Sequence, residues 1–254
     1  MSSYQVPNQN KLPKPHLEPP KKGWPTRLPD GVVRLLLIPL MIVLISVPQL
    51  PMGFVYAKYR SGQPLGDLPY YGLFALMILL YTLSILFVRW IIHRYTDQPL
   101  LRRWEARDWK FLGVGYLVMM AAKMIMVPLY TQMTGQQSTQ NDAAIQKLLG
   151  SGSQMMWMIV FMTVIGAPIL EEMVFRGYIM NAWYTRNPIW SVIISGALFA
   201  AVHQNNSFWG TLMYFVLGAV LAVTYRQTGN MGVNIGLHFL NNAPIIFVAL
   251  NLIK

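Results

Sequence analysis

The sequence predicts an all-α fold, a polytopic membrane helix bundle with about seven transmembrane helices. Hydrophobic residues make up 54% of the 254 residues and charged residues only 11%, with a mean hydropathy of +0.39. The apolar residues also occur in blocks near the ~20 residues that an α-helix needs to cross a bilayer. A soluble domain of this length does not need several such blocks.

The first 31 residues differ in composition from the rest of the chain. Residues 1–31 contain seven prolines and five lysines or arginines, too polar and proline-rich a composition to pack, so we expect a disordered cytosolic tail. Residues 32–254 should form the membrane domain. Residues 141–149 suit a short amphipathic surface helix. The spans are expected at 33–57, 70–92, 110–132, 155–182, 188–204, 209–225 and 231–252.

The positive charges predict how the spans are oriented. Six lysines or arginines precede residue 35 and six lie between residues 89 and 110, whereas the 57–69 connection has two and the 133–154 connection has one. Cytosolic flanks carry the excess of Lys and Arg. We therefore expect a multi-pass protein of the cell membrane with a cytosolic N-terminus, an external C-terminus and a cytosolic hairpin at Arg186-Asn187.

Composition also limits the class of function. The chain has no cysteine, which excludes disulfides, thiolate zinc sites and a cysteine nucleophile. The net charge of +11 lies mostly beside the spans, where orientation and anionic lipid account for it. We therefore expect the lipid bilayer as a partner and no nucleic acid.

The dipeptide Glu171-Glu172 holds the only two acids inside a hydrophobic block, in a chain with nine acids. Charge in a bilayer is expensive, so this pair indicates a functional site. Glu172 and Arg176 are four residues apart on one helical face and should form an ion pair. Glu171 is rotated by about 100° and lacks that partner, which makes it the candidate general base. The alternative is an interfacial ion pair at the cytosolic end of the span.

Histidines mark two further segments of interest. Glu171 and His203 each lie sixteen residues from the expected turn at Asn187, so equal helical rise would place them at one depth, where they could share a water. His238 and Asn242 lie four apart on the last span, as a site or as an interhelical hydrogen bond. The same treatment of depth puts His238 about 13 Å from the level of His203, so either the spans at 188–204 and 209–225 tilt or the 204–208 connection folds into the bundle. Lys123, in the third span, could snorkel, pair with the acids or line a cavity.

The ordered motifs resemble those of the CAAX-protease and bacteriocin-processing family, also called Abi. They are Glu-Glu-x-x-x-Arg at 171–176, Phe-x-x-x-His at 199–203 and His-x-x-x-Asn at 238–242. The resemblance covers about residues 150–250, and the first three spans are similar only in hydropathy. It implies an intramembrane glutamic protease without metal or other cofactor, acting on a membrane-associated peptide or protein.

The resemblance also implies a role for each motif residue. Glu171 and His203 would activate a water, and His238 and Asn242 would support the oxyanion. Glu172 with Arg176 would organise the site.

Two alternatives stay open. Some family members are implicated in bacteriocin immunity or scaffolding, so a non-proteolytic membrane scaffold or immunity protein is the second hypothesis. The third is a zinc-dependent membrane protease in which Glu171, His203 and His238 form a His2Glu ligand set. The chain has no His-Glu-x-x-His motif, which together with the resemblance favours the metal-free protease.

Overall fold

The computed structural model describes residues 30–96, 100–182 and 188–252, and their regular structure is helical, as predicted. Nearly all of the expected tail at 1–31 and the expected turn at Arg186-Asn187 lie outside these residues. The helices are α1 Asp30–Ser46, α2 Leu50–Arg60, α3 Asp67–Tyr95, α4 Ala106–Thr134, α5 Gln140–Leu149, α6 Ser153–Phe161, α7 Ala167–Glu172, α8 Met180–Ala182, α9 Pro188–Val202, α10 Phe208–Thr228, α11 Met231–Asn242 and α12 Pro244–Leu252. A 3-10 turn, η2 Val47–Gln49, and two π-helical stretches, η3 Met162–Gly166 and η4 Met173–Ile179, connect some of them.

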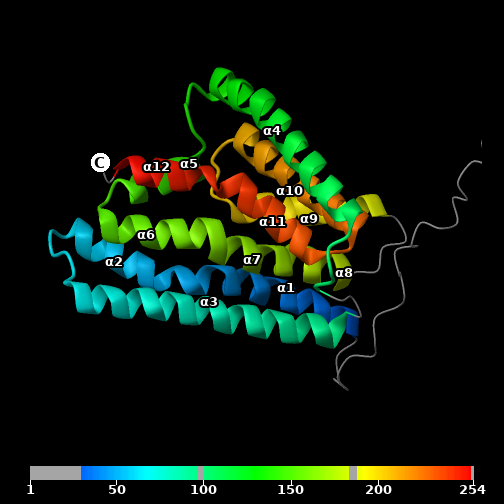
Figure 1. Ribbon diagram of the computed structural model, residues 1–254, viewed down its shortest axis with the longest axis horizontal. Helices are drawn as coiled ribbons and strands as arrows, with labels where there is room; N and C mark the ends of the chain where they lie inside the picture. The colour runs from blue at the N-terminus through cyan, green and yellow to red at the C-terminus, as the bar shows by residue number, and fades with distance from the viewer. Residues whose placement is uncertain (1–29, 97–99, 183–187, 253–254) are drawn as a thin grey trace, which may run out of the picture.

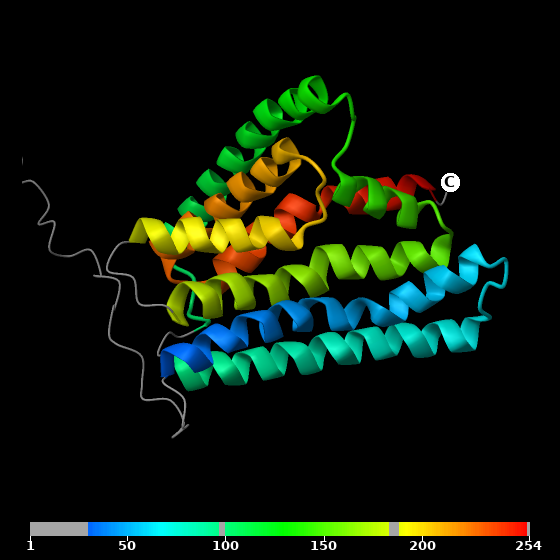
Figure 2. The ribbon, with the colours of Figure 1, turned by 180° about the vertical axis from the view of Figure 1, so that it is seen from behind.

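The helices form two groups that meet along the fourth predicted span (Figures 1 and 2). In one group α1, α2 and α3 lie beside α6, α7 and α8, with their axes nearly aligned. In the other, α10 contacts α4, α9 and α11, and α4, α10 and α11 are inclined to the first group. The helix α7 contacts both α3 and α11, so it lies at the boundary between the groups. The fourth span is accordingly 67% buried over its apolar window, against 17% for α4.

Six of the seven predicted spans are confirmed as helical segments long and apolar enough to cross a membrane. They are Gly31–Arg60, Asp67–Tyr95, Ala106–Thr134, Ser153–Ile179, Phe208–Thr228 and Met231–Leu252. The span predicted at 188–204 is instead α9, an apolar helix of 15 residues. At 1.5 Å per residue it is about 22 Å long, shorter than the ~30 Å hydrocarbon core. Its C-terminal end therefore lies inside the bundle, and His203 follows immediately.

Prolines break the first and last spans. The turn η2 contains Pro48 and separates α1 from α2, and Pro244 begins α12 directly after α11. Proline lacks a backbone N–H and cannot continue the hydrogen-bond ladder of a helix, which accounts for both breaks. The break at Pro244 directs α12 onto α6.

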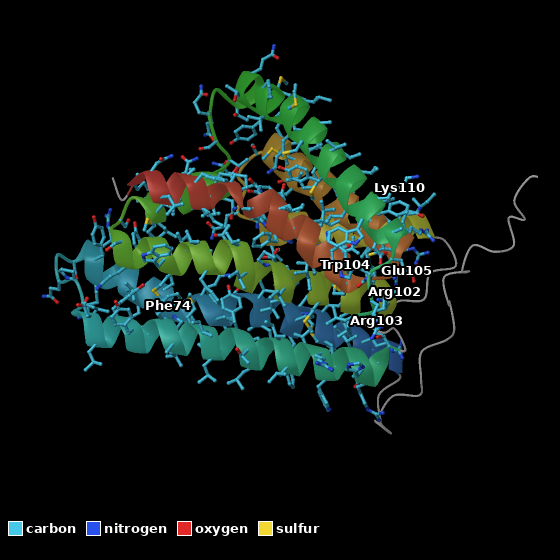
Figure 3. The ribbon with its side chains drawn as sticks, in the orientation of Figure 1. Phe74, Arg102, Arg103, Trp104, Glu105 and Lys110 are labelled. Atoms are coloured by element: carbon cyan, nitrogen blue, oxygen red, sulfur yellow. The ribbon has the colours of Figure 1, made fainter. Side chains whose placement is uncertain are left out.

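The described lysines and arginines gather at one end of the molecule, which we call the basic end. It lies where α3 and α10 end and α1, α4 and α11 begin, and Figure 3 labels three of its cations at the start of α4. The basic end comprises Arg34, Arg89, Arg94, Arg102, Arg103, Arg107, Lys110 and Arg226. The opposite end carries only Lys58, Arg60 and Lys147 among the described residues.

One partly buried ion pair fixes the chain at the basic end. Arg102 binds both carboxylate oxygens of Asp108 at 2.8 Å and donates to the carbonyl of Thr228 at 2.9 Å. This bidentate geometry fixes both partners, as a guanidinium and a carboxylate permit. The connection before α4 is thereby tied to the end of α10.

Candidate active site

Glu171 and Glu172 lie on a short α-helical segment, α7, between the π-helical stretches η3 and η4. Pro168 lacks the N–H that would bond the preceding turn, which favours the wider π turn before α7. Close packing restricts both stretches. A Cβ added at Gly166 would lie 2.9 Å from the Tyr81 ring, and one added at Gly177 would lie 2.8 Å from Ile92. These contacts with α3 hold the acids at the centre of the molecule.

Glu172 accepts hydrogen bonds from three different side chains. Arg176 Nη1 donates to Oε1 at 3.0 Å, His238 Nδ1 lies 2.9 Å from the same oxygen, and Asn234 Nδ2 donates to Oε2 at 3.1 Å. The side chains of Glu172 and Arg176 are fully buried. The expected ion pair is therefore present, but it lies in the interior of the protein. The alternative of a solvated pair at the end of a span is wrong.

Glu171 lies near His238, a neighbour that the helical spacing did not predict. Its Oε2 is 4.0 Å from Nε2 of His238, and no Lys or Arg of the described residues lies within salt-bridge distance of it. The other nitrogen of His238 is already engaged by Glu172. The imidazole of His238 therefore lies between the two glutamates, with Nδ1 bonded to Glu172 and Nε2 near Glu171.

The ring of His203 is fixed by three contacts. Its Nδ1 lies 2.7 Å from the carbonyl oxygen of Phe199, and its centroid is 4.5 Å from the Phe199 ring and 4.3 Å from the Tyr214 ring. A carbonyl oxygen can only accept, so Nδ1 carries the proton. Nε2 of the neutral ring is then an acceptor, as a general base requires.

His203 and His238 are brought together by the aromatic ring of Phe199. The ring of His238 lies 5.8 Å from that of Phe199, which His203 also contacts. The expected 13 Å difference in level is therefore wrong. That estimate assumed antiparallel helices without tilt, whereas α10 and α11 are inclined to the helices of the first group.

Asn242 is oriented by its neighbours in the same region. Its Nδ2 donates to the carbonyl of Thr163 at 2.8 Å, and its Oδ1 accepts from Asn241 at 2.9 Å. Because the Thr163 carbonyl can only accept, these bonds identify which amide atom is nitrogen. A second N–H of that nitrogen is available to a ligand.

A single cavity of about 620 Å³ joins these groups. Glu171, His203, His238 and Asn242 line it, whereas Glu172 and Arg176 lie behind it. Lys123 also lines the cavity and donates to the carbonyl of Asn241 at 3.4 Å. Of the three possibilities for Lys123, the structure supports the cavity-lining one.

The helix predicted at 141–149 is present as α5, capped by the Thr139 side chain, but it is more than a surface helix. Its Asn141 and Asp142 line the cavity, and both bond the hydroxyl of Tyr214, at 3.0 Å each. Tyr214 thus links α5 to the His203 ring. The bond between Tyr214 and Asp142 joins residues 72 positions apart, and the spacing of residues along one helix does not reveal such a contact. Sequence analysis therefore missed Tyr214.

Asn234 is a second residue that sequence analysis missed. It lies four residues before His238 on the same face of α11, and it is completely buried. Its amide nitrogen donates to Glu172 and to the carbonyl of Leu221 at 2.7 Å. Asn234, His238 and Asn242 follow one another at intervals of four residues, so they lie on one face of α11. This spacing could have identified Asn234 from the sequence.

Replacing Tyr214 tests whether its ring positions His203. Tyr214→Phe keeps the stacked ring and should retain most activity. Tyr214→Leu removes it and should lower kcat about 10- to 100-fold with little change in KM, because a misplaced catalytic group slows the chemical step. Kinetics on a cleaved peptide measure both values. Equal losses for the two variants would show that the hydroxyl, and not the stack, matters.

The described residues contain no group of three or more His, Asp or Glu side chains arranged to hold a metal ion. The zinc alternative thus lacks a preformed ligand set in this part of the chain.

Comparison with known proteins places the three motifs in one matched region. Residues 153–244 match the family described as "Type II CAAX prenyl endopeptidase Rce1-like". "Uncharacterized protein YyaK" of Bacillus subtilis (strain 168) is 28% identical over 103 residues, 36% of this chain and 34% of that protein. "Putative membrane peptidase YdiL" of the same organism is 31% identical over 98 residues, 38% of this chain and 39% of that protein. The chain therefore spans less than half the length of either relative. No solved structure matches it.

Proposed function

We propose that the protein is an intramembrane endopeptidase of the Rce1-like family of CAAX proteases, which residues 153–244 match, and that Glu171 and His203 activate its water nucleophile. The six helical segments of spanning length support a multi-pass membrane protein, and the family match supports a protease-like region within it. The bond cleaved is a peptide bond in a membrane-associated peptide or protein. The single observation that carries the proposal is the shared cavity of Glu171, His203, His238 and Asn242.

The first step is attack by water on the substrate carbonyl. No Lys or Arg of the described residues lies within salt-bridge distance of Glu171, and Nε2 of His203 is an acceptor, so both side chains can take a hydrogen bond from one water. Glu171 removes a proton as the oxygen attacks the carbonyl carbon. It then returns that proton to the leaving amine, which balances the hydrolysis.

The second requirement is stabilisation of the tetrahedral oxyanion. Nδ2 of Asn242 has one N–H left after its bond to Thr163, and Nε2 of His238 faces Glu171 in the cavity. His238 donates from Nε2 when both ring nitrogens carry a proton, because Nδ1 is directed to Glu172. Two preorganised donors in a cavity sheltered from bulk water are the usual means of stabilising such a charge.

Glu172 and Arg176 act on this site through other residues. They line no part of the cavity, and their contacts are to His238, Asn234 and the carbonyl of Gly218, the last at 2.7 Å. We assign them as positioning residues that hold the His238 ring. Residues that fix a catalytic group in this way support precise geometry at the reacting atoms.

We also propose that the protein lies in the cell membrane with its N-terminus in the cytosol. The concentration of Lys and Arg at the basic end supports this orientation. The lipid bilayer is a partner of the exposed apolar helix faces. The basic residues lie at a membrane boundary, so we propose no nucleic-acid partner.

The experiment that tests this proposal separates it from both alternatives. Purified protein in detergent is incubated with solubilised membrane proteins before and after exhaustive chelation, and new peptide termini are identified by mass spectrometry. We expect the same products in both conditions, because a glutamate and a histidine activate water without an ion. Products that vanish on chelation and return with zinc would establish a metalloprotease, and no products in either condition would favour the scaffold.

A further inference from the structure

The cavity lies in the half of the molecule away from the basic end. Its lining comes from the second half of α1, the middle of α4, α5, the ends of α9 and α11, and α12. None of the basic-end residues lines it. In Figure 1, α5 and α12 lie toward one side of the bundle, and the beginning of α4 and α8 lie toward the other.

The cavity has exposed lining residues on that same side. Glu171 and His238 are buried, whereas Ser46 at the end of α1, Gln146 on α5 and Gln204 after α9 line the cavity and are exposed. The two exposed glutamines mark an opening between α5 and the 203–207 connection.

The cavity also borders the lipid-facing surface of the same half. Pro244 and Val248 of α12 line it and are exposed. Lys123, Asn141 and Gln146 supply polar groups on its other walls. An occupant would thus combine a polar backbone segment, placed at Glu171, with an adjoining apolar segment beside α12.

Because cytosolic flanks carry the excess of Lys and Arg, the basic end faces the cytosol. We propose that the cavity opens to the extracytosolic side and that its substrate is a membrane-anchored polypeptide cut in a segment already translocated across the membrane. The assignment of a substrate rests on the proposed protease function. The side on which the cavity opens is a property of the structure and can be tested without activity.

The absence of cysteine allows a direct test with single cysteines. Gln146→Cys and Gln204→Cys probe the opening, Gln137→Cys probes the exposed α4–α5 connection, and Arg103→Cys probes the exposed basic end. Each variant of the full chain is treated in intact spheroplasts with a membrane-impermeant maleimide, and again after permeabilisation. We expect residues 137, 146 and 204 to label fully in intact spheroplasts and residue 103 only after permeabilisation.

Two labelling results would overturn the inference. Labelling of residue 103 alone in intact spheroplasts would show the opposite orientation. Labelling of residue 137 with none at 146 and 204, before or after permeabilisation, would show that the cavity does not open there. Because labelling needs no turnover, a failed protease with the expected labelling would refute only the proposed function. New termini found only in cytosolic segments of membrane proteins would refute the substrate assignment while leaving the protease intact.

Discussion

Glu171→Gln and His203→Ala should each abolish peptide cleavage while the protein still inserts and purifies normally. Removing a general base typically lowers a rate by about 10²- to 10⁴-fold, so the cleavage rate of either single variant should fall to the detection limit. Glutamine keeps the shape of Glu171 but cannot take the proton. The measurement is the rate of cleavage of a peptide that the wild type cleaves.

A matched control separates chemistry from folding. Asp67→Asn makes the same acid-to-amide change at an exposed position in the first turn of α3, far along the chain from the cavity. It should cleave like the wild type, and all three variants should melt within a few degrees of it. Wild-type rates from Glu171→Gln or His203→Ala would rule out the mechanism.

Arg176→Ala should lower both the stability and the activity of the protein. Both Arg176 and Glu172 are completely buried, so removing the cation leaves a carboxylate uncompensated in the interior. Breaking a buried pair in this way costs about 3 to 5 kcal/mol. The lost bond to the Gly218 carbonyl and the cavity left by the side chain act in the same direction. Thermal melting in detergent measures the change.

A double variant provides the matched comparison. Glu172→Gln with Arg176→Met removes both charges and keeps most of the volume, and replacement of a whole buried pair is far better tolerated than loss of one partner. Its melting temperature should lie above that of Arg176→Ala. Its activity should stay low, because the amide no longer holds His238 as the carboxylate does. A melting temperature of Arg176→Ala equal to that of the wild type would refute the structural pairing and reassign Arg176 to substrate or lipid contact.

Local spacing predicted the features of this protein that depend on one helix. Hydropathy located six segments of spanning length, and the i to i+4 spacing located the contact of Glu172 with Arg176. Both follow from helical geometry alone. The same reasoning placed Glu171 off that face, where it lines the cavity.

Features that depend on where a helix stops were not predictable in this way. The 188–204 segment was predicted to span the membrane, whereas α9 has only 15 residues. Hydropathy does not distinguish a short buried apolar helix from the core of a span. Tyr214 escaped notice because its role arises from contacts between α10 and α5, whereas the i to i+4 spacing of Asn234 and His238 on α11 was readable and was overlooked. The tail at 1–31, including His16, lies almost wholly outside the described residues and stays a prediction.

The most direct test of the central claim compares the termini of membrane proteins in cells that express the wild type, Glu171→Gln or His203→Ala. Mass spectrometry of enriched N- and C-terminal peptides measures every cleavage at once. If Glu171 and His203 activate water for peptide hydrolysis, a set of new termini appears with the wild type and is absent from both variants at equal expression. Identical termini in all three would contradict the claim and leave the chain with a non-proteolytic role.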